Sequence, residues 1–314
     1  MAEAAAPGPT APGRLRSAWE SDLAWSFRRS PTVVAAALVT GLILAAALLA
    51  PWIAPHDPFD LASLNLMDSL LPPVWEKDGS WTFPLGTDDQ GRDLLSAILY
   101  GARISLAVGV LAVLFATVLG VGLGLIAGWA GGVAETAIMR LADVQLSFPA
   151  ILVALLIDGI ARTALPRDLH ARLAIWVIVL AIGFSTWVGY ARTVRASTLV
   201  ERSKEYVLAA RIIGVHPARI LLTHVLPNVI GPVLVIATIQ LAVAIVTEAT
   251  LSFLGLGMPP TEPSLGTLIR VGNNFLLSGE WWIALFPGAT LAILVLAVNL
   301  LGDWLRDALN PRLR

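Results

Sequence analysis

The side chains that most often do chemistry are few in this sequence, and their spacing does not suit catalysis. None of the four histidines has metal-ligand spacing with another histidine or with an acid: His56, His170, His216 and His224. There is no cysteine, which excludes disulfides, thiolate metal sites and cysteine nucleophiles. No G-x-x-x-x-G-K-[ST] motif is present, and Gly255 and Gly257 lack the strand-turn-helix context of a dinucleotide fingerprint. We therefore expect no catalytic residue and no metal or cofactor bound by this chain.

Glu248 is an acid inside a long apolar run, where an ionisable group is costly and is by default a functional candidate. A proton relay would need partner acids, and no other acid recurs at that depth. The alternative is a structural acid that is hydrogen-bonded near the outer end of its span. Arg140 and Asp143 are three residues apart, so a helix would bring them together. We predict that these two form a structural ion pair.

A segment of ten residues, Glu205–Gly214, has the pattern of a short helix between two long apolar runs. Gly214 can end that helix in a left-handed conformation. Pro217 can open a second helix at its first position, and that helix is expected to end where Pro227 breaks the chain. The segment therefore predicts a helix, a tight turn and a second helix at the membrane surface.

Two adjacent alanines, Ala209 and Ala210, would give the first of these helices a flat patch of small side chains. Such a patch lets another protein approach the helix backbone closely. The alternative is an ordinary amphipathic helix on the surface. The residues alone do not decide between the two.

The composition explains why these helices should lie at a membrane. Hydrophobic residues make up 57% of the chain and charged residues 14%, with a mean hydropathy of +0.77, whereas a soluble domain carries roughly 25% charged residues. The net charge of -1 gives no field that would attract nucleic acid. Six apolar runs approach the roughly 20 residues that a spanning helix needs: Val33–Ala54, Ile104–Gly132, Ala134–Ile157, Leu173–Ala191, Val229–Gly257 and Trp281–Gly302. The second run carries small residues at every fourth position, Gly120, Gly124 and Gly128, which predicts close packing against another helix.

Lysine and arginine beside the runs set the expected orientation. They are frequent in the N-terminal tail, in the connection between the fourth and fifth runs and at the C-terminus, which six spans would place on one side. We therefore expect both termini in the cytoplasm. The first thirty residues are expected to be a mostly disordered tail that ends in a short surface helix around Ala18–Arg29. A cleaved signal peptide is disfavoured because the first run is longer than a signal core.

Several stretches together resemble the permeases of binding-protein-dependent ABC importers, in the dipeptide, oligopeptide and nickel branch. The motif Glu-x-x-x-Ala-Ala followed by Gly214 and Leu226-Pro227 is similar to the coupling loop of that family. The resemblance extends to further stretches: Gly86–Asp93 with Tyr100–Leu106, Met139–Asp143 with Phe148-Pro149, Glu248–Gly257, and Asn299–Asp303 with Leu305–Asp307. It covers the chain from about residue 31 to residue 311, and the extra first span suits the C-type subunit. Thr250 departs from the pattern, because serine is commoner there.

The resemblance implies an all-α, polytopic membrane protein with about six transmembrane helices and a cytoplasmic coupling helix, the type I permease fold. Its expected parts are a cytoplasmic tail (1–30), a first transmembrane helix with a periplasmic loop (31–100), the permease core (101–303) and a second cytoplasmic tail (304–314). It implies that the coupling helix meets an ATPase subunit through six residues: Glu205, Tyr206, Ala209, Ala210, Arg211 and Gly214.

The resemblance also implies partners and a location. The expected partners are a homologous second permease, two cytoplasmic ATPase subunits that hold ATP and magnesium, a periplasmic substrate-binding protein, and lipid of the bacterial inner membrane. The expected cargo is di- or oligopeptides, moved by alternating access that the ATPase subunits drive. Nickel, opine or glutathione-type cargo of the same branch is the alternative. An ion-coupled secondary transporter is the remote alternative, because it would need charged residues or broken helices at mid-membrane. A membrane-embedded enzyme would need a catalytic constellation that the sequence lacks.

A charged cluster before the second run has two interpretations. Asp88, Asp89, Arg92 and Asp93 could shape the external mouth and contact the binding protein or the second permease. Alternatively, this is a capped helix start, in which Asp93 favours the positive end of the helix dipole.

Overall fold

The computed structural model describes residues 22–60 and 64–308. Most of the two predicted tails therefore lies outside the described residues. Within them, the regular elements are helices: α2 Asp22–Arg29, α3 Pro31–Leu48, α4 Ala50–Ile53, η1 Leu66–Asp68, α5 Leu94–Ala130, α6 Gly132–Leu146, α7 Ala150–Ala164, α8 Arg167–Glu201, α9 Glu205–Ile212, α10 Pro217–Ile220, η2 Leu221–Val225, α11 Leu226–Phe253, α12 Leu265–Phe275, η3 Leu276–Ser278 and α13 Trp282–Ala308.

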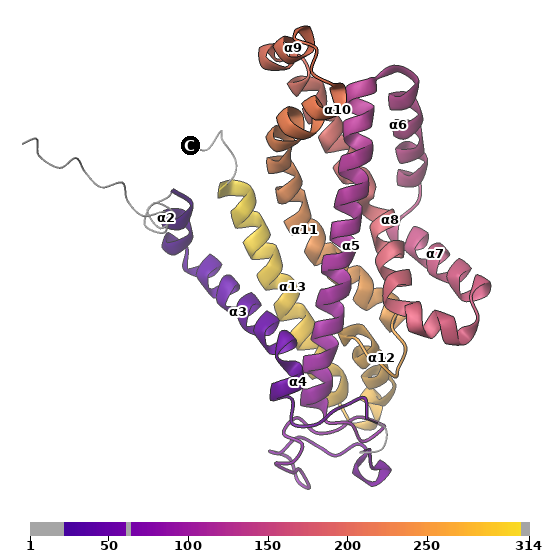
Figure 1. Cartoon of the computed structure of the whole chain (residues 1–314). Coiled ribbons are helices and arrows are strands. Elements are labelled where there is room, and N and C mark those ends of the chain that lie inside the picture. The colour runs from indigo at the N-terminus through magenta and orange to yellow at the C-terminus, as the bar shows by residue number, and fades with distance from the viewer. Residues whose placement is uncertain (1–21, 61–63, 309–314) are drawn as a thin grey trace, which may run out of the picture.

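The long helices form a bundle with two different ends (Figure 1). One end carries α9 and α10; the other carries α12 and the segment 54–93, and we call these the α9 end and the α12 end. In the described part of the chain, five helices are long and apolar enough to cross a membrane, and the bent pair α6–α7 makes a sixth if it counts as one span. The prediction of an all-α protein with about six spans is confirmed.

The third span is not the straight helix that we expected over Ala134–Ile157. It is broken into α6 and α7, which meet at an angle of 94°. Pro149 follows the break, and a proline disfavours the α conformation of the residue before it, here Phe148. The Ser147 hydroxyl donates to the Asp143 carbonyl and so closes the last turn of α6. Because α6 and α7 are both apolar, the hydrophobic run in the sequence does not reveal the break between them.

The glycine stripe of α5 packs against α8, as predicted. A Cβ on Gly120 would lie 2.5 Å from the Cβ of Tyr190, and one on Gly124 would lie 2.6 Å from the Ala191 carbonyl oxygen. A Cβ on Gly128 would lie 2.6 Å from the Cβ of Thr198. Any side chain at these positions would push the two helices apart, so this contact depends on glycine.

Two helices extend beyond the apolar runs that predicted them. α5 begins at Leu94 rather than near Ile104, and α8 continues to Glu201. Arg192 and Arg195, which we assigned to a loop, therefore lie on α8. A long apolar run marks where lipid can be, but a helix continues past the lipid as long as its hydrogen bonds and neighbours support it.

Candidate functional site

The helix α9 lies at the tip of its end of the bundle, on the far side from α12 (Figure 1). Gly214 follows it with a φ of +80°, the left-handed conformation predicted for this position. A Cβ at residue 214 would meet nothing within 4 Å. Glycine is therefore suited to this position by the backbone angle and not by a shortage of space.

The inner face of α9 is part of the hydrophobic core. Val207 and Ala210 are buried in a cluster with Ile220, Val225 and Val229, so α9 packs on α10 and the start of α11. This corrects the predicted small-residue patch. Ala209 is exposed, but Ala210 faces inward and is not available to another protein.

The outer face of α9 carries large apolar side chains that the sequence analysis did not single out. Ile212 is 85% exposed, Ile213 78% and Leu208 45%. Leu208 and Ile212 are four residues apart, so they share a helix face with the exposed Ala209. The spacing could have revealed this face, but only if Ala210 had been recognised as buried.

Polar contacts fasten α9 to two neighbouring helices. The Tyr206 hydroxyl donates to the carboxylate of Glu201 at the end of α8, and the Asn228 amide of α11 donates to the Tyr206 oxygen over 3.2 Å. Lys204 Nζ lies 2.6 Å from Glu201 Oε1. Burial and the Glu201 carboxylate raise the pKa of Tyr206 to about 12. The phenol therefore stays protonated, and stays a donor, at every physiological pH.

A third attachment joins α9 to α5. The Arg211 guanidinium lies over the Trp129 ring, 4.1 Å from its centroid. The neighbouring Arg202 Nη1 donates to the Gly128 carbonyl over 2.8 Å. Since α9 is held to α5, α8 and α11, a push on its outer face is passed to three long helices.

The helix after the turn is not ended by Pro227, as we expected. α10 continues through a π-helical turn, η2, directly into α11. Pro227 lies in the first turn of α11, where a missing N–H is tolerated. The π turn absorbs the irregularity, so α10 and α11 form one continuous helix through η2.

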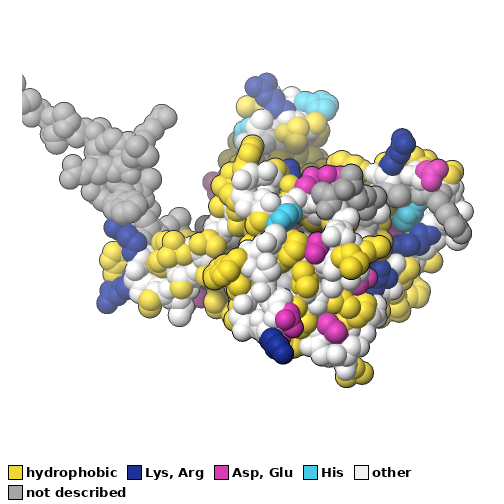
Figure 2. Space-filling view, turned by 90° about the horizontal axis from the view of Figure 1, so that it is seen from below, with side chains coloured by type: hydrophobic (Ala, Val, Ile, Leu, Met, Phe, Trp, Pro, Cys, Tyr) yellow, Lys and Arg dark blue, Asp and Glu magenta, His cyan; other side chains and the backbone are white. Residues whose placement is uncertain are grey.

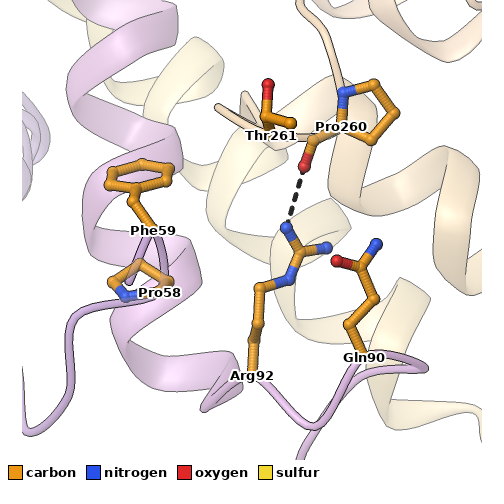
Figure 3. A pocket seen from close by; sticks show the side chains of 6 residues that line it. All are labelled: Pro58, Phe59, Gln90, Arg92, Pro260 and Thr261. Carbon is orange, nitrogen blue, oxygen red and sulfur yellow. Dashed lines mark hydrogen bonds between the residues drawn. The ribbon is translucent and has the colours of Figure 1, made fainter. Parts of the chain in front are cut away.

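Three of the four residues in the charged cluster at positions 88–93 are buried inside the chain. This corrects the expectation that the cluster forms a contact surface. Asp88, Arg92 and Asp93 are at most 2% exposed. Arg92 Nε donates to Asp88 Oδ2 over 2.6 Å, and Arg92 Nη1 donates to the Pro260 carbonyl over 2.9 Å (Figure 3). Arg92 therefore fastens the segment 54–93 to the loop after α11.

The capped helix start is confirmed for Asp93. Its carboxylate accepts from the Ser96 N–H over 3.0 Å and from the Ser96 hydroxyl, at the first turn of α5. Asp89 is half-buried. Burial and the neighbouring Asp88 raise the pKa of Asp89.

The predicted pair of Arg140 and Asp143 is not formed. Asp143 instead pairs with Arg192 of α8, with 2.6 Å between Oδ1 and Nη2. Glu135 of α6 likewise accepts from Arg195 of α8. Sequence spacing made Arg140 the nearer partner, but α8 runs beside α6 and brings two arginines within reach.

Glu248 is completely buried and hydrogen-bonded. The hydroxyls of Ser105 and Ser252 each donate to one of its carboxylate oxygens over 2.7 Å. The Leu265 N–H donates to the Ser105 hydroxyl over 3.3 Å, which adds α12 to the network. The geometry suits a structural acid that joins α5, α11 and α12.

A metal ion needs several ligand side chains close together. Among the described residues, no group of three or more histidine, aspartate and glutamate side chains is arranged to bind one. The features that stand out are therefore surfaces and helix connections.

Comparison with known proteins places the chain. Residues 120–314, more than half of it, match the family described as binding-protein-dependent transport system inner membrane component, and residues 17–73 match the N-terminal transmembrane domain of oligopeptide transport permease C. The chain is 38% identical to the di/tripeptide transport system permease protein DppC of Pseudomonas aeruginosa, over 100% of this chain and 97% of the relative. It is 39% identical to the dipeptide transport system permease protein DppC of Haemophilus influenzae, over 88% of each.

A solved structure shares the fold. The inward-facing MetNI methionine ABC transporter superposes with a TM-score of 0.53 at 18% identity, over 69% of this chain and 98% of that chain. The family match and the full-length relatives agree with the helical bundle described above. The chain therefore belongs to the family of binding-protein-dependent transport system inner membrane components.

Proposed function

We propose that this chain is a permease subunit of an ATP-driven importer that carries di- or oligopeptides across the bacterial inner membrane. The relatives are named for dipeptide and di/tripeptide transport, which supports the cargo class. Nickel, opine or glutathione-type cargo is the alternative. The chain itself is not the ATPase: ATP and magnesium are held by separate partner subunits.

The single observation that carries the proposal is the construction of α9. Its outer face is apolar and exposed, while its inner face is packed and fastened to α5, α8 and α11. An exposed apolar patch at the tip of a bundle is typical of a protein interface. We assign this face to a cytoplasmic ATPase subunit, with Leu208, Ala209 and Ile212 in the contact.

In this mechanism the chain forms half of a pore together with a homologous second permease. A binding protein delivers the peptide at the α12 end. ATP brings two ATPase subunits together at the α9 end, and their movement rocks the helices between outward-open and inward-open states. Such a switch needs contacts at α9 that differ between the two states.

The orientation has its own test, because the chain contains no cysteine. A cysteine at Ser80, near the α12 end, is expected to react with an impermeant thiol reagent in intact cells. A cysteine at Ser203, beside α9, is expected to be protected until the membrane is opened. Labelling at Ser203 in intact cells would invert the proposed topology.

The function is tested by purification and reconstitution. The chain should co-purify with a second permease and an ATPase, and vesicles that hold the complex should take up labelled dipeptide only with ATP and binding protein. Uptake driven by an ion gradient without ATP would instead identify a secondary transporter. Uptake of another cargo, with dipeptide refused, would keep the importer and replace the substrate.

A further inference from the structure

A small basic cleft lies at the α12 end, between the α7–α8 turn and the loop after α11. Its volume is about 150 Å³, roughly ten times the ~15 Å³ that one water molecule requires. Arg162 of α7, His170 of α8 and Arg270 of α12 line it, and loop residues 255–260 form one wall. Figure 2, which views this end, shows basic, acidic and histidine side chains at its right-hand edge, on the side where α7 and α8 lie.

The charges around the cleft do not balance. Among the described residues, Asp158 is the one acid in an ion pair with the lining residues: its Oδ2 lies 2.6 Å from Arg162 Nε, and its Oδ1 lies 3.7 Å from His170 Nε2. Asp158 is 1% exposed. Its carboxylate therefore offsets part of the positive charge of the cleft without occupying the open volume. No acid among the described residues pairs with Arg270. With His170 neutral, the two arginines and Asp158 leave a net charge of about +1.

Hydrogen-bonding capacity is also left over. His170 Nε2 is buried without a hydrogen-bond partner, and it lies 3.7 Å from Asp158 Oδ1. Arg270 reaches across the loop: its Nη1 lies 2.6 Å from the place that a Cβ on Gly255 would occupy. The guanidinium therefore lies where a side chain at residue 255 would displace it.

The wall of the cleft is fixed in place on its other side. Arg92 holds the Pro260 carbonyl (Figure 3), the Met258 N–H donates to the Ser252 hydroxyl over 3.2 Å, and the Thr267 hydroxyl donates to the Met258 carbonyl. A cleft with fixed walls binds without first having to order its loop.

We infer that this cleft receives a carboxylate side chain of the substrate-binding protein when that protein docks at the α12 end. The inference rests on the proposed function. Guanidinium groups bind carboxylates with paired, charge-assisted hydrogen bonds, and the volume suits the end of one acidic side chain. The family description itself names a binding protein as the partner. Asp88, Arg92 and Asp93 are buried and cannot contact the binding protein. We therefore assign that contact to Arg162, His170 and Arg270.

The test uses the complete importer in lipid nanodiscs and measures ATPase activity as loaded binding protein is titrated. Arg270→Gln is the main variant, because it breaks no internal ion pair. The concentration of binding protein that gives half-maximal stimulation should rise about five- to tenfold at low salt, and its salt dependence should become shallower. The maximal rate should stay unchanged. Arg270→Lys should recover part of the loss.

Arg172→Gln is the matched control, since Arg172 is exposed at the same end of α8 but does not line the cleft. It should leave the titration unchanged. An unchanged half-maximal concentration in both Arg270→Gln and His170→Gln complexes that assemble normally would overturn the inference. A second result would also overturn the inference. If these variants selectively lose uptake of peptides with a free carboxylate relative to peptide amides, the cleft binds the cargo and not the binding protein. If the wild-type complex is not stimulated by binding protein, the proposed function fails instead.

Discussion

The Arg211 guanidinium lies 4.1 Å from the centroid of the Trp129 ring, so the end of α9 is held against the end of α5. An arginine over a tryptophan face contributes roughly 0.5–1 kcal/mol at an exposed site. Together with the Tyr206–Glu201 hydrogen bond, this contact makes α9 move with the bundle rather than independently of it.

Removing the Arg211 contact should loosen coupling without preventing assembly. Arg211→Gln is expected to lower uptake per ATP hydrolysed by about two- to fivefold, because α9 can then tilt on its hydrophobic base. Uptake and hydrolysis are measured together in proteoliposomes. Arg219→Gln, on the exposed side of α10, serves as the control and should behave as wild type. Equal uptake per ATP in both variants would show that the contact is not used.

Tyr206 should titrate far above the physiological range. Its folded pKa of about 12 is higher than the ordinary tyrosine pKa of about 10, so the phenol form is favoured by the fold. The stabilisation is fully present below pH 10 and is lost as the pH rises through about 12. The chain has three tyrosines, and a tyrosinate absorbance titration of Tyr206→Phe against wild type isolates this one. A transition near pH 10 that Tyr206→Phe removes would contradict the hydrogen bond between Tyr206 and Glu201.

The same substitution should lower stability at neutral pH. Tyr206→Phe leaves one Glu201 oxygen without its donor, which is expected to cost about 1–3 kcal/mol. Thermal unfolding of the purified complex in detergent measures the loss. It should be equal at pH 6 and pH 9, since the phenol is protonated at both.

Two glycines on α5 offer a matched pair. A Cβ at Gly124 would lie 2.6 Å from the Ala191 oxygen of α8, whereas one at Gly122 would meet nothing within 4 Å. Gly124→Ala is therefore expected to destabilise the helix pair by about 1–3 kcal/mol, and Gly122→Ala to be neutral or slightly stabilising. Thermal stability of the complex measures both. Equal melting temperatures would mean that α5 and α8 can separate without cost.

The features that the sequence predicted well are those set by local pattern. The glycine spacing at 120, 124 and 128 and the left-handed Gly214 can be predicted from neighbouring residues alone. The spanning helices can be predicted from the length of their apolar runs. The features that it missed depend on partners distant in the chain. Asp143 pairs with Arg192 rather than Arg140, and Arg92 lies buried because Asp88 and the Pro260 carbonyl receive it. Ala210 faces inward because Ile220 and Val225 fold back onto it.

The proposed ATPase contact predicts a clear difference between the two faces of α9. Ile212 is 85% exposed and touches no core cluster, so Ile212→Glu should leave the chain inserted, folded and paired with the second permease. It would place a charge in an apolar interface, and the ATPase should dissociate or fail to respond to binding protein. We expect at least a tenfold loss of uptake, which corresponds to about 1.4 kcal/mol or more. Uptake and co-purified ATPase are the two measurements.

The control must carry the same charge on the same loop without facing the partner. Arg219→Glu serves as this control, because Arg219 is exposed on α10 and not on α9. Ala209→Trp should resemble Ile212→Glu by wedging the interface apart, since Ala209 is exposed on that face. Full uptake in both Ile212→Glu and Ala209→Trp would mean that α9 is a solvated surface helix, and the coupling mechanism would have to be assigned to another part of the chain.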